Sequence, residues 1–503
     1  MRIVEQIQVR HTSGPVAVRN LSFRLVGEEQ RVILLSFISG SFTSDNRLQI
    51  QALFDFLENL SDEQATGALS RVEQRYASRH ADFRERVLEN YDKAKNVSGM
   101  ELRNYTRRLL AGSYFTMEYA FQASALFNPS IVPHPDQSGL NGGALRFVMS
   151  LRAVGEGHLS SVVFHTGIID SLGGVTFDPP AAFTAPTQVS PDRFYVKALF
   201  QRRLMELGLD NAIVEECLST LPESFSPAEL NVAAARVRGS TSVGSKVHTC
   251  LESMLWLGRS NYRLSLPPGS AINQLFLFPK SDNESRGIED LRLVRFVEDD
   301  GAVTFFGTYT AFNGMSIMPV LIETNDFRTV SHHTLNGACA QNKGMALFPR
   351  RIDGHFAMCS RIDGRNLFLM FSDHVHFWET AKLLAAPKYA WEFRLIGNCG
   401  SPIETPEGWL LVTHGVGAMR QYAIGAMLLD LRDPSKIRGR LREPMIVSTE
   451  DEREGYVPNV VYSCGSLLWN GKLVLPYAIS DRKTAVAEID IDGLLQTLLS
   501  EGP

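Results

Sequence analysis

Two neighbouring carboxylates, Glu289 and Asp290, precede Arg292 in the segment GIEDLRLVRF at residues 287–296. A carboxylic acid can protonate a leaving oxygen, provided that its pKa is held near the working pH. Burial beside Glu289 would raise the pKa of Asp290, whereas the charge of Arg292 would lower it, and the sequence does not decide which effect is larger. The alternative is a solvated aspartate at the start of a strand, because charged side chains are mostly exposed.

Other polar residues stand at predicted strand ends or in turns of the chain. In a β-propeller such positions converge on a central pocket, so residues that are far apart in the sequence can meet there. Taken one at a time, each has the simpler interpretation of a surface charge or a turn residue. The candidates are Asn128, Arg152, Arg259, Arg263, Arg292, Lys343, Arg361, His414, Asn459 and Asp481.

The 503-residue chain has a globular composition, with 44% hydrophobic and 21% charged residues. Its formal net charge of -5, without a polybasic run, makes nucleic acid an unfavoured partner. The opening residues MRIVEQIQVRHTSG contain no apolar signal core, and the apolar window 408–431 is interrupted by His414, Arg420 and Gln421. We therefore expect a cytoplasmic protein without membrane contact. The six cysteines show no CxxC spacing, so neither a structural zinc nor a disulfide framework is expected.

Several large enzyme classes lack their motif in this chain. The sequence contains no G-x-S-x-G, no G-x-x-x-x-G-K-[ST], no H-E-x-x-H and no G-x-G-x-x-G. Gly155-Glu156-Gly157-His158 is a short polar segment that fits a turn between two strands as well as a loop that touches a ligand.

The first 125 residues are predicted to form an N-terminal extension. The segment RVILLSFISG at residues 31–40 is typical of a strand. The capping-box sequence at residues 61–64 is followed by apolar residues at helical spacing, which predicts a helix over 62–94. A similar sequence at 98–101 predicts a second helix over 99–125.

Residues 126–503 are predicted to form an all-β domain. Short alternating apolar segments are separated by Asp299-Asp300-Gly301, Asp363-Gly364 and Asn470-Gly471, which are hairpin signals because these residues tolerate positive φ. Repeated hairpins favour a β-propeller, with a sandwich or barrel as the alternative. Residues 191–236 interrupt this pattern with a predicted helical insertion, in which Ser226 is the N-cap and Pro227 the first helical residue.

Five blocks occur in order along the chain: GIEDLRLVRF, NKGMALFPRRIDGHFAMCSR, GNCGSPIETPEGWLLVTHGV, IGAMLLDLRDPSKI and EREGYVPNVVYSCG. Together they resemble glycoside hydrolase family 130, whose members are five-bladed propellers that act on β-mannosides. The resemblance covers roughly residues 126–495. The helical extension and the insertion lie outside the compact family pattern and are similar to those of its longer members, the β-1,2-oligomannan phosphorylases.

The resemblance implies a role for each matching residue. Asp290, in the family's Glu-Asp-x-Arg block, would be the sole general acid. Lys343, Arg361 and His414 would bind inorganic phosphate, and Asn128 and Arg152 would contact mannose. The remaining substrate-binding candidates are Glu289, Arg292, Tyr456, Asn459 and Asp481. The chain has Leu291 where the family usually has Pro, and Tyr456 where some members carry Asp.

The chemistry agrees with this set. Inverting hydrolysis needs a second carboxylate to activate water, whereas phosphate arrives as an anionic nucleophile and needs cations to hold it. We therefore expect an inverting phosphorylase with no cofactor, whose partners are a β-mannooligosaccharide and inorganic phosphate as co-substrate. The alternatives are a β-mannosidase, with Glu404 or Glu454 as base, and a non-catalytic mannoside-binding propeller. The helices of the extension are a possible surface for homo-oligomer contacts.

Overall fold

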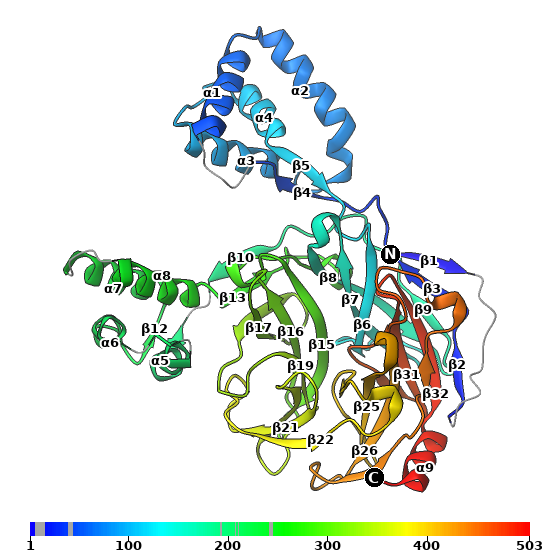
Figure 1. The fold of residues 1–503 in the computed structure, drawn as a ribbon. Coiled ribbons are helices and arrows are strands. Elements are labelled where there is room, and N and C mark those ends of the chain that lie inside the picture. Colours follow the sequence, from blue (N-terminus) through cyan, green and yellow to red (C-terminus); the bar gives the residue numbers. More distant parts are fainter. Residues whose placement is uncertain (6–15, 39–43, 192–193, 207, 210, 241–244) are drawn as a thin grey trace.

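The computed structural model describes residues 1–503 apart from 6–15, 39–43, 192–193, 207, 210 and 241–244 (Figure 1). Strands outnumber helices as the regular structure of the described chain, as the turn pattern predicted, and two groups of helices extend from the sheets. Figure 1 shows α1–α4 above the sheets and α5–α8 at one side of them.

Antiparallel strands that are consecutive in the chain form most of the sheets. The largest sheet joins two such groups through one parallel pairing, between Gly287 and Ser160. Its first group comprises β6 (Ala125–Pro133), β7 (Leu145–Val154), β8 (Ser160–Ile169), β9 (Val175–Phe177) and β14 (Phe276–Leu277). Its second group comprises β15 (Gly287–Val297), β16 (Val303–Phe312), β17 (Ile317–Thr324), β18 (Thr329–Thr334), β13 (Tyr262–Ser265) and β10 (Gln188–Pro191).

Three further sheets follow along the chain. One comprises β19 (Lys343–Leu347), β20 (Phe356–Arg361), β21 (Leu367–Ser372) and β22 (Ala381–Ala385). The next comprises β23 (Leu395–Asn398), β24 (Ile403–Thr405), β25 (Gly408–Val416), β26 (Tyr422–Leu429), β27 (Ile437–Arg440) and β28 (Ile446–Val447). The last contains β29 (Val461–Tyr462), β30 (Leu467–Trp469), β31 (Lys472–Ile479) and β32 (Lys483–Asp490), and the C-terminal helix α9 (Ile491–Glu501) follows it.

The predicted hairpin turns are present in the structure. Gly301 and Gly364 have positive φ between the strands that they connect. Asn470 and Gly471, with φ of 47° and 72°, form the two-residue turn from β30 to β31. Both central residues of a type I′ turn need positive φ, which explains the Asn-Gly pair at this position.

The N-terminal strands belong to the last sheet, so the predicted boundary at residue 125 is wrong for the first residues of the chain. β2 (Val18–Asn20) and β3 (Phe23–Val26) pair with β32, and β1 (Arg2–Glu5) pairs with β3. The side chains of Val18 and Leu25 are fully buried. This pairing covers an edge of β32 that would otherwise expose unpaired backbone groups.

The helices of the extension differ from the two that the sequence predicted. The structure describes α1 (Ser44–Glu58), α2 (Asp62–Tyr76), α3 (Phe83–Ser98) and α4 (Tyr105–Tyr114), between the strands of a two-stranded antiparallel sheet of β4 (Ile33–Ser36) and β5 (Thr116–Tyr119). The capping box at Ser61 is confirmed. The predicted start near residue 99 is instead a helix end, because Gly99 has φ of 72° and caps α3. The strand predicted at 31–40 lies in part outside the described residues.

The helical insertion is longer than predicted. It contains β11 (Tyr195–Val196), α5 (Lys197–Glu206), α6 (Ala212–Ser219), β12 (Ser224–Phe225), α7 (Pro227–Ser240) and α8 (Ser245–Gly258). Its predicted start at 191 adjoins residues outside the described part of the chain. The N-cap at Ser226 is confirmed, since its Oγ accepts from the backbone N of Glu229 at 3.2 Å. The predicted end at 236 was too early because α8 packs its apolar face on α6 and α7.

The sheets are covered on both faces. All nine residues of β25 are buried, and Leu410 of this strand shares one apolar cluster with Leu475 of β31 and Leu494 of α9. Polar side chains that remain buried inside such sheets need partners, which makes them informative about function. Among the helices that the structure describes, none combines the length and the apolar character needed to cross a bilayer.

Candidate active site

Irregularities in three strands position the central polar residues. The pairing register shifts between Phe127 and Ser130 in β6, between Glu289 and Arg292 in β15, and between Lys343 and Ala346 in β19. The residues within these bulges have positive φ: 48° at Asn128, 58° at Asp290 and 84° at Gly344. A bulge turns a side chain away from the regular sheet direction, and Asn, Asp and Gly enter this backbone region most readily. β15 lies against β6 and β19, so the three bulges are neighbours.

The carboxylate of Asp290 is held by two side chains from other strands. Its Oδ1 accepts from Asn128 Nδ2 at 2.7 Å and from Arg152 Nη1 at 3.2 Å. Burial acts to raise the pKa of Asp290, but the charges of Arg152, Arg292 and Lys343 and the hydrogen bond from Asn128 outweigh it and lower the pKa to about 2. The carboxyl group is therefore ionised in the free protein.

Glu289 connects this acid to the lysine. Its Oε1 accepts from Arg152 Nη2 at 2.9 Å and its Oε2 accepts from Lys343 Nζ at 2.5 Å. Arg152 thus binds both neighbouring carboxylates, and the exposed fraction is 15% for each carboxylate and 35% for Lys343. Lys343 is more exposed than Arg152, at 35% against 17%, and its amine is paired with Glu289 alone among the carboxylates of this group.

Arg361 lies beside the lysine and is positioned by a histidine. Lys343 and Arg361 are opposite each other in the β19–β20 pairing. Arg361 Nη1 donates to His414 Nε2 at 3.1 Å, and His414 Nδ1 donates to the backbone oxygen of Asn398 at 3.1 Å. Burial, followed by the charges of Arg361 and Arg292, holds the pKa of His414 well below its ordinary value. His414 is neutral and orients Arg361 rather than adding a positive charge.

Sequence reasoning missed two residues that support this group. Tyr462 accepts a hydrogen bond from Arg292 Nη2, and Arg292 Nη1 also donates to the backbone oxygen of Asp290 at 3.0 Å. Asn398 donates to the backbone oxygen of Gly344 at 2.5 Å, inside the β19 bulge. Both residues lie in sequence blocks that carry the family resemblance, Asn398 in GNCGSP and Tyr462 in VPNVVYSCG. Their place in these blocks could have identified them as candidate site residues.

Asp481 belongs electrostatically to the same group. It lies in the turn between β31 and β32 with φ of 49°. Burial, and then the negative charge of Asp290, raise its pKa to about 7, although Arg152 and Arg420 act in the opposite direction. The pKa of Asp290 is therefore below the ordinary value of an aspartate, and the pKa of the neighbouring Asp481 is above it.

The structure gives Tyr456 and Asn459 other hydrogen-bond partners. The hydroxyl of Tyr456 is 2.6 Å from His158 Nδ1, and the tyrosine is exposed. Asn459 Oδ1 accepts from Arg453 Nε at 3.2 Å. The segment 155–158 is a turn with a short 3₁₀ element. His158 lies at its end, and the imidazole of His158 makes the contact with Tyr456. The structure brings together Asn128, Arg152, Glu289, Asp290, Arg292, Lys343, Arg361, His414 and Asp481.

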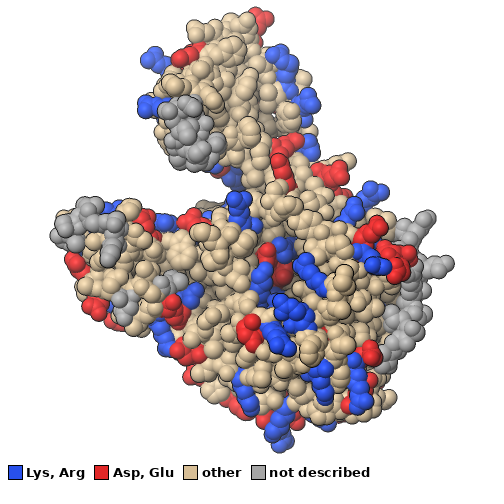
Figure 2. Space-filling model, in the orientation of Figure 1, with Lys and Arg blue, Asp and Glu red and all other residues tan. Residues whose placement is uncertain are grey.

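Figure 2 shows basic and acidic side chains gathered where one face of the sheet-rich part is hollowed. The chemistry of the connected group is that of an anion site beside an acid: Asp290 with Glu289 and Asp481 near it, the cations Lys343 and Arg361, and a neutral histidine that fixes Arg361. Bidentate arginine and a point-charge lysine are suited to a phosphate dianion.

Comparisons with known proteins agree with this chemistry. Residues 270–500 match the profile of the glycoside hydrolase 130 family, described as beta-1,4-mannooligosaccharide phosphorylase. Asp290, Lys343, Arg361 and His414 lie inside the matched region, whereas Asn128 and Arg152 precede it. The match is thus narrower than the 126–495 that the resemblance suggested.

Named relatives are phosphorylases. The chain is 32% identical over 216 residues to the 1,2-beta-oligomannan phosphorylase of Thermoanaerobacter sp. (strain X514), covering 42% of this chain and 71% of that protein. It is 27% identical over 230 residues to the Beta-1,2-mannobiose phosphorylase of Listeria innocua, covering 44% of this chain and 63% of that protein. A solved structure of Beta-1,2-Mannobiose phosphorylase from Listeria innocua is similar with a TM-score of 0.43 and 18% identity, over 75% of this chain and 93% of that one.

Proposed function

This chain belongs to the glycoside hydrolase 130 family, and we propose that it is an inverting phosphorylase that cleaves terminal β-mannosidic linkages with inorganic phosphate. The products are α-mannose 1-phosphate and a mannoside shortened by one unit, and the reaction is reversible. The observation that carries the proposal is the connected group in which one aspartate, Asp290, lies within a network that also holds Lys343 and leads to Arg361.

Phosphate binds where Lys343 and Arg361 face each other. Lys343 leaves Glu289 in part to contact the phosphate, and Arg361 is already directed by His414. Orientation of an anionic nucleophile toward the anomeric carbon supplies much of the rate enhancement in such a reaction. His414 stays neutral in this step, because a second hydrogen bond from its Nδ1 to Asn398 fixes the tautomer that accepts from Arg361.

Asp290 gives its proton to the leaving oxygen. The carboxylate that is ionised in the free protein must first gain a proton, and the bound phosphate favours this because its negative charge offsets the charges of Arg152, Arg292 and Lys343 that hold the pKa down. A phosphate oxygen then bonds to the anomeric carbon as the glycosidic C–O bond breaks, and the proton of Asp290 passes to the leaving oxygen. The proton that the new phosphomonoester releases to solvent replaces the one that Asp290 gave up.

Asn128, Arg152 and Glu289 bind the terminal mannose. Their polar atoms surround the Asp290 carboxylate, so hydroxyl groups of the sugar can exchange hydrogen bonds with the same network. The names of the two phosphorylases from Thermoanaerobacter sp. and Listeria innocua refer to β-1,2-linked mannosides, and a β-1,2-oligomannan is the substrate class that we assign.

The fold that fits this activity is a five-bladed β-propeller. The blades are β6–β9, β15–β18, β19–β22, β23–β27 and β29–β32, and the strands β1–β3 complete the last of them. The catalytic unit is then residues 126–503 together with the N-terminal strands, and α1–α4 and α5–α8 are additions to it. In this proposed arrangement the bulged strands β6, β15 and β19 are the innermost strands of their blades, with their polar residues near the axis.

The β-mannosidase alternative needs a second carboxylate that activates water. Of the two bases that the sequence suggested, Glu404 is held in a bidentate pair by Arg350 Nε and Nη2, both at 2.8 Å, and Glu454 is exposed. The pair with Arg350 holds Glu404 outside the network around Asp290, and within the described part of the chain no hydrogen bond joins Glu454 to that network.

The test is product analysis with β-1,2-mannooligosaccharides, with and without inorganic phosphate, by ³¹P and ¹H NMR. We expect α-mannose 1-phosphate only with phosphate, and we expect Asp290→Asn to lower the rate by about 10³-fold because the general acid is lost. Glu404→Gln is the matched control and should keep full activity. Free mannose released at a phosphate-independent rate would transfer the assignment to a hydrolase, and binding without turnover would leave a mannoside-binding protein.

A further inference from the structure

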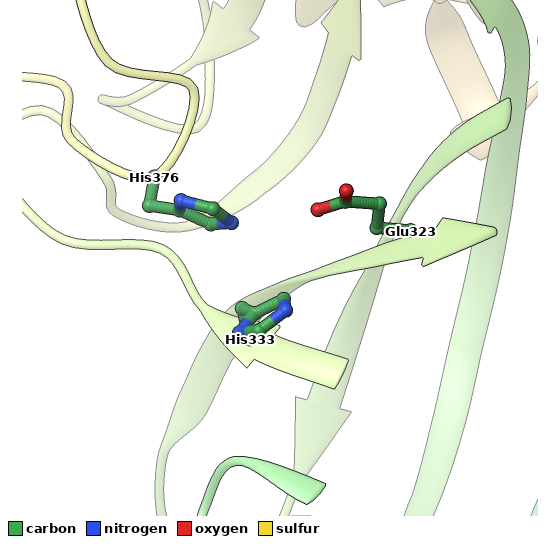
Figure 3. A group of neighbouring side chains, drawn as sticks. All are labelled: Glu323, His333 and His376. Atoms are coloured by element: carbon green, nitrogen blue, oxygen red, sulfur yellow. The ribbon is translucent and has the colours of Figure 1, made fainter. Parts of the chain in front are cut away.

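We propose that Glu323, His333 and His376 bind one divalent transition-metal ion, with zinc as the preferred metal, at a site separate from the catalytic group. One ligand atom from each residue lies within 4.8 Å of the other two. Figure 3 shows the carboxylate of Glu323 directed toward the two imidazole rings, which come from different segments of the chain.

The strand register places the first two ligands on one face. Leu321 of β17 is opposite His333 of β18, and Glu323 is opposite Ser331. Residues two apart on a strand share a face, so Glu323 and His333 are diagonal neighbours on the same side of the sheet. His332 projects to the other side, where it is fully buried against Tyr262. The alternation thus places His332 and His333 on opposite faces of the sheet, and only His333 is on the face of Glu323.

The third ligand comes from the loop between β21 and β22 of the next sheet. The backbone oxygen of His376 accepts from Asn336 N at 2.9 Å, and Trp378 N donates to the backbone oxygen of Asn336 at 2.7 Å. The loop is therefore fastened at His376 and at Trp378 to the segment that follows β18. This backbone pairing presents the imidazole to Glu323 and His333 without a rearrangement of the chain.

The donor set fits zinc. Two imidazoles and one carboxylate suit zinc and other late first-row metals, whereas Mg²⁺ and Ca²⁺ prefer oxygen ligands. Ligand atoms about 2.0–2.1 Å from a tetrahedral zinc are roughly 3.4 Å apart, so the side chains need only small rotations from the separation seen here. Three protein ligands leave the fourth position to water. The rings of His333 and His376 are already in T-shaped contact, with centroids 4.7 Å apart.

An ion at this position would fasten the base of the helical insertion. Arg202 of α5 forms an ion pair with Glu379 at 2.8 Å and lies 4.1 Å from the centroid of the Phe377 ring, directly after His376. Glu206 of the same helix accepts from Gly337 N at 3.0 Å. Helix α5 thus rests on the two segments that the metal would join, so metal binding should stabilise the seat of α5–α8 against the sheets.

The full chain, stripped of metal by a chelator and dialysed, is titrated with Zn²⁺ against a chromophoric chelator and with Co²⁺ by visible absorption. We expect one equivalent of either ion, tetrahedral or five-coordinate cobalt bands, and a thermal midpoint that rises with Zn²⁺. His333→Ala, His376→Ala and the shape-conserving Glu323→Gln should each weaken zinc binding by at least about 100-fold.

His355→Ala is the matched control, because His355 is a half-exposed histidine that pairs with Asp373 at 2.7 Å outside this group. It should bind zinc as the unchanged chain does. Circular dichroism and phosphate-dependent turnover establish that each variant is folded. Zinc affinity that is the same in Glu323→Gln and His376→Ala as in the unchanged chain, or no binding at micromolar free zinc, would overturn the proposal.

Discussion

Replacing Asp481 with asparagine removes a negative charge from the neighbourhood of Asp290 and keeps the shape of the side chain. Asparagine also tolerates the positive φ of 49° at this position, so the backbone is not strained by the change. The experiment therefore isolates the electrostatic cost of ionising Asp481 in the folded protein.

The sign and the size of the effect follow from the pKa. The pKa of Asp481 is raised from 3.8 to about 7 by folding, so the folded state binds more protons than the unfolded state between these two values. Stability contributed at this site therefore falls as the pH rises from about 4 to about 7. A difference of about 3 pKa units corresponds to about 4 kcal/mol as an upper bound, which Asp481→Asn should recover at pH 8 and mostly not at pH 4.

Urea denaturation measured by tryptophan fluorescence at pH 4 and pH 8 tests this. Four of the five tryptophans (378, 391, 409 and 469) lie in the sheet-rich part of the chain, so the signal reports the unfolding of that part. Asp353→Asn is the control, because Asp353 has the same φ of 49° in an exposed turn, and its effect should stay within about 0.5 kcal/mol at both pH values. A variant at Asp481 that is less stable at pH 8, or whose effect is independent of pH, would refute the reasoning.

Three further predictions concern two glycine positions and one buried ion pair. In Gly397→Ala the added Cβ would lie 2.5 Å from His414 Cε1, so the imidazole ring must move. The KM for phosphate should then rise by at least about 10-fold in steady-state kinetics. The KM for the mannoside, measured in the same experiment, is the internal comparison. In Arg440→Met the fully buried Glu392 loses its ion pair, which should cost about 3–5 kcal/mol in urea denaturation, and an unchanged midpoint would argue against a buried charge. Gly67 lies within α2, and the nearest atom to a new Cβ there would be 3.6 Å away. Gly67→Ala should therefore raise the free energy of unfolding by about 1 kcal/mol, measured from the thermal midpoint. A lower thermal midpoint would contradict this prediction.

Local patterns predicted local structure well where one residue decides the backbone. The Asn470-Gly471 turn and the N-cap at Ser226 need only neighbouring residues, and both are present. Ser98-Gly99 shows the limit of this reasoning, since the same letters can begin a helix or end one. The outcome depended on Asn104, which accepts from the backbone N atoms of residues 106 and 107 and starts α4 five residues later.

The candidate site was predicted as a set of residues but not as a set of charges. Asp290, Lys343, Arg361 and His414 do form a connected group. The neutral state of His414 was not predictable, because it results from burial and from arginines on other strands. The same applies to the glutamate, histidine and histidine group at 323, 333 and 376, whose members have no recognisable metal-binding spacing in the sequence.

The sequence by itself determined the turns and caps, which depend on neighbours in the chain, and it indicated the candidate site residues through the Glu-Asp-x-Arg block and the other family blocks. Only the tertiary structure decided the ionisation of Asp290, which the sequence had left open between burial and Arg292. Among the charges that lower the pKa of Asp290, that of Arg152 on β7 has the largest effect. Asn128 and Lys343, which also lower it, come from two further strands. Electrostatic free energy depends on distance in space and on burial, and neither quantity exists until the strands have paired.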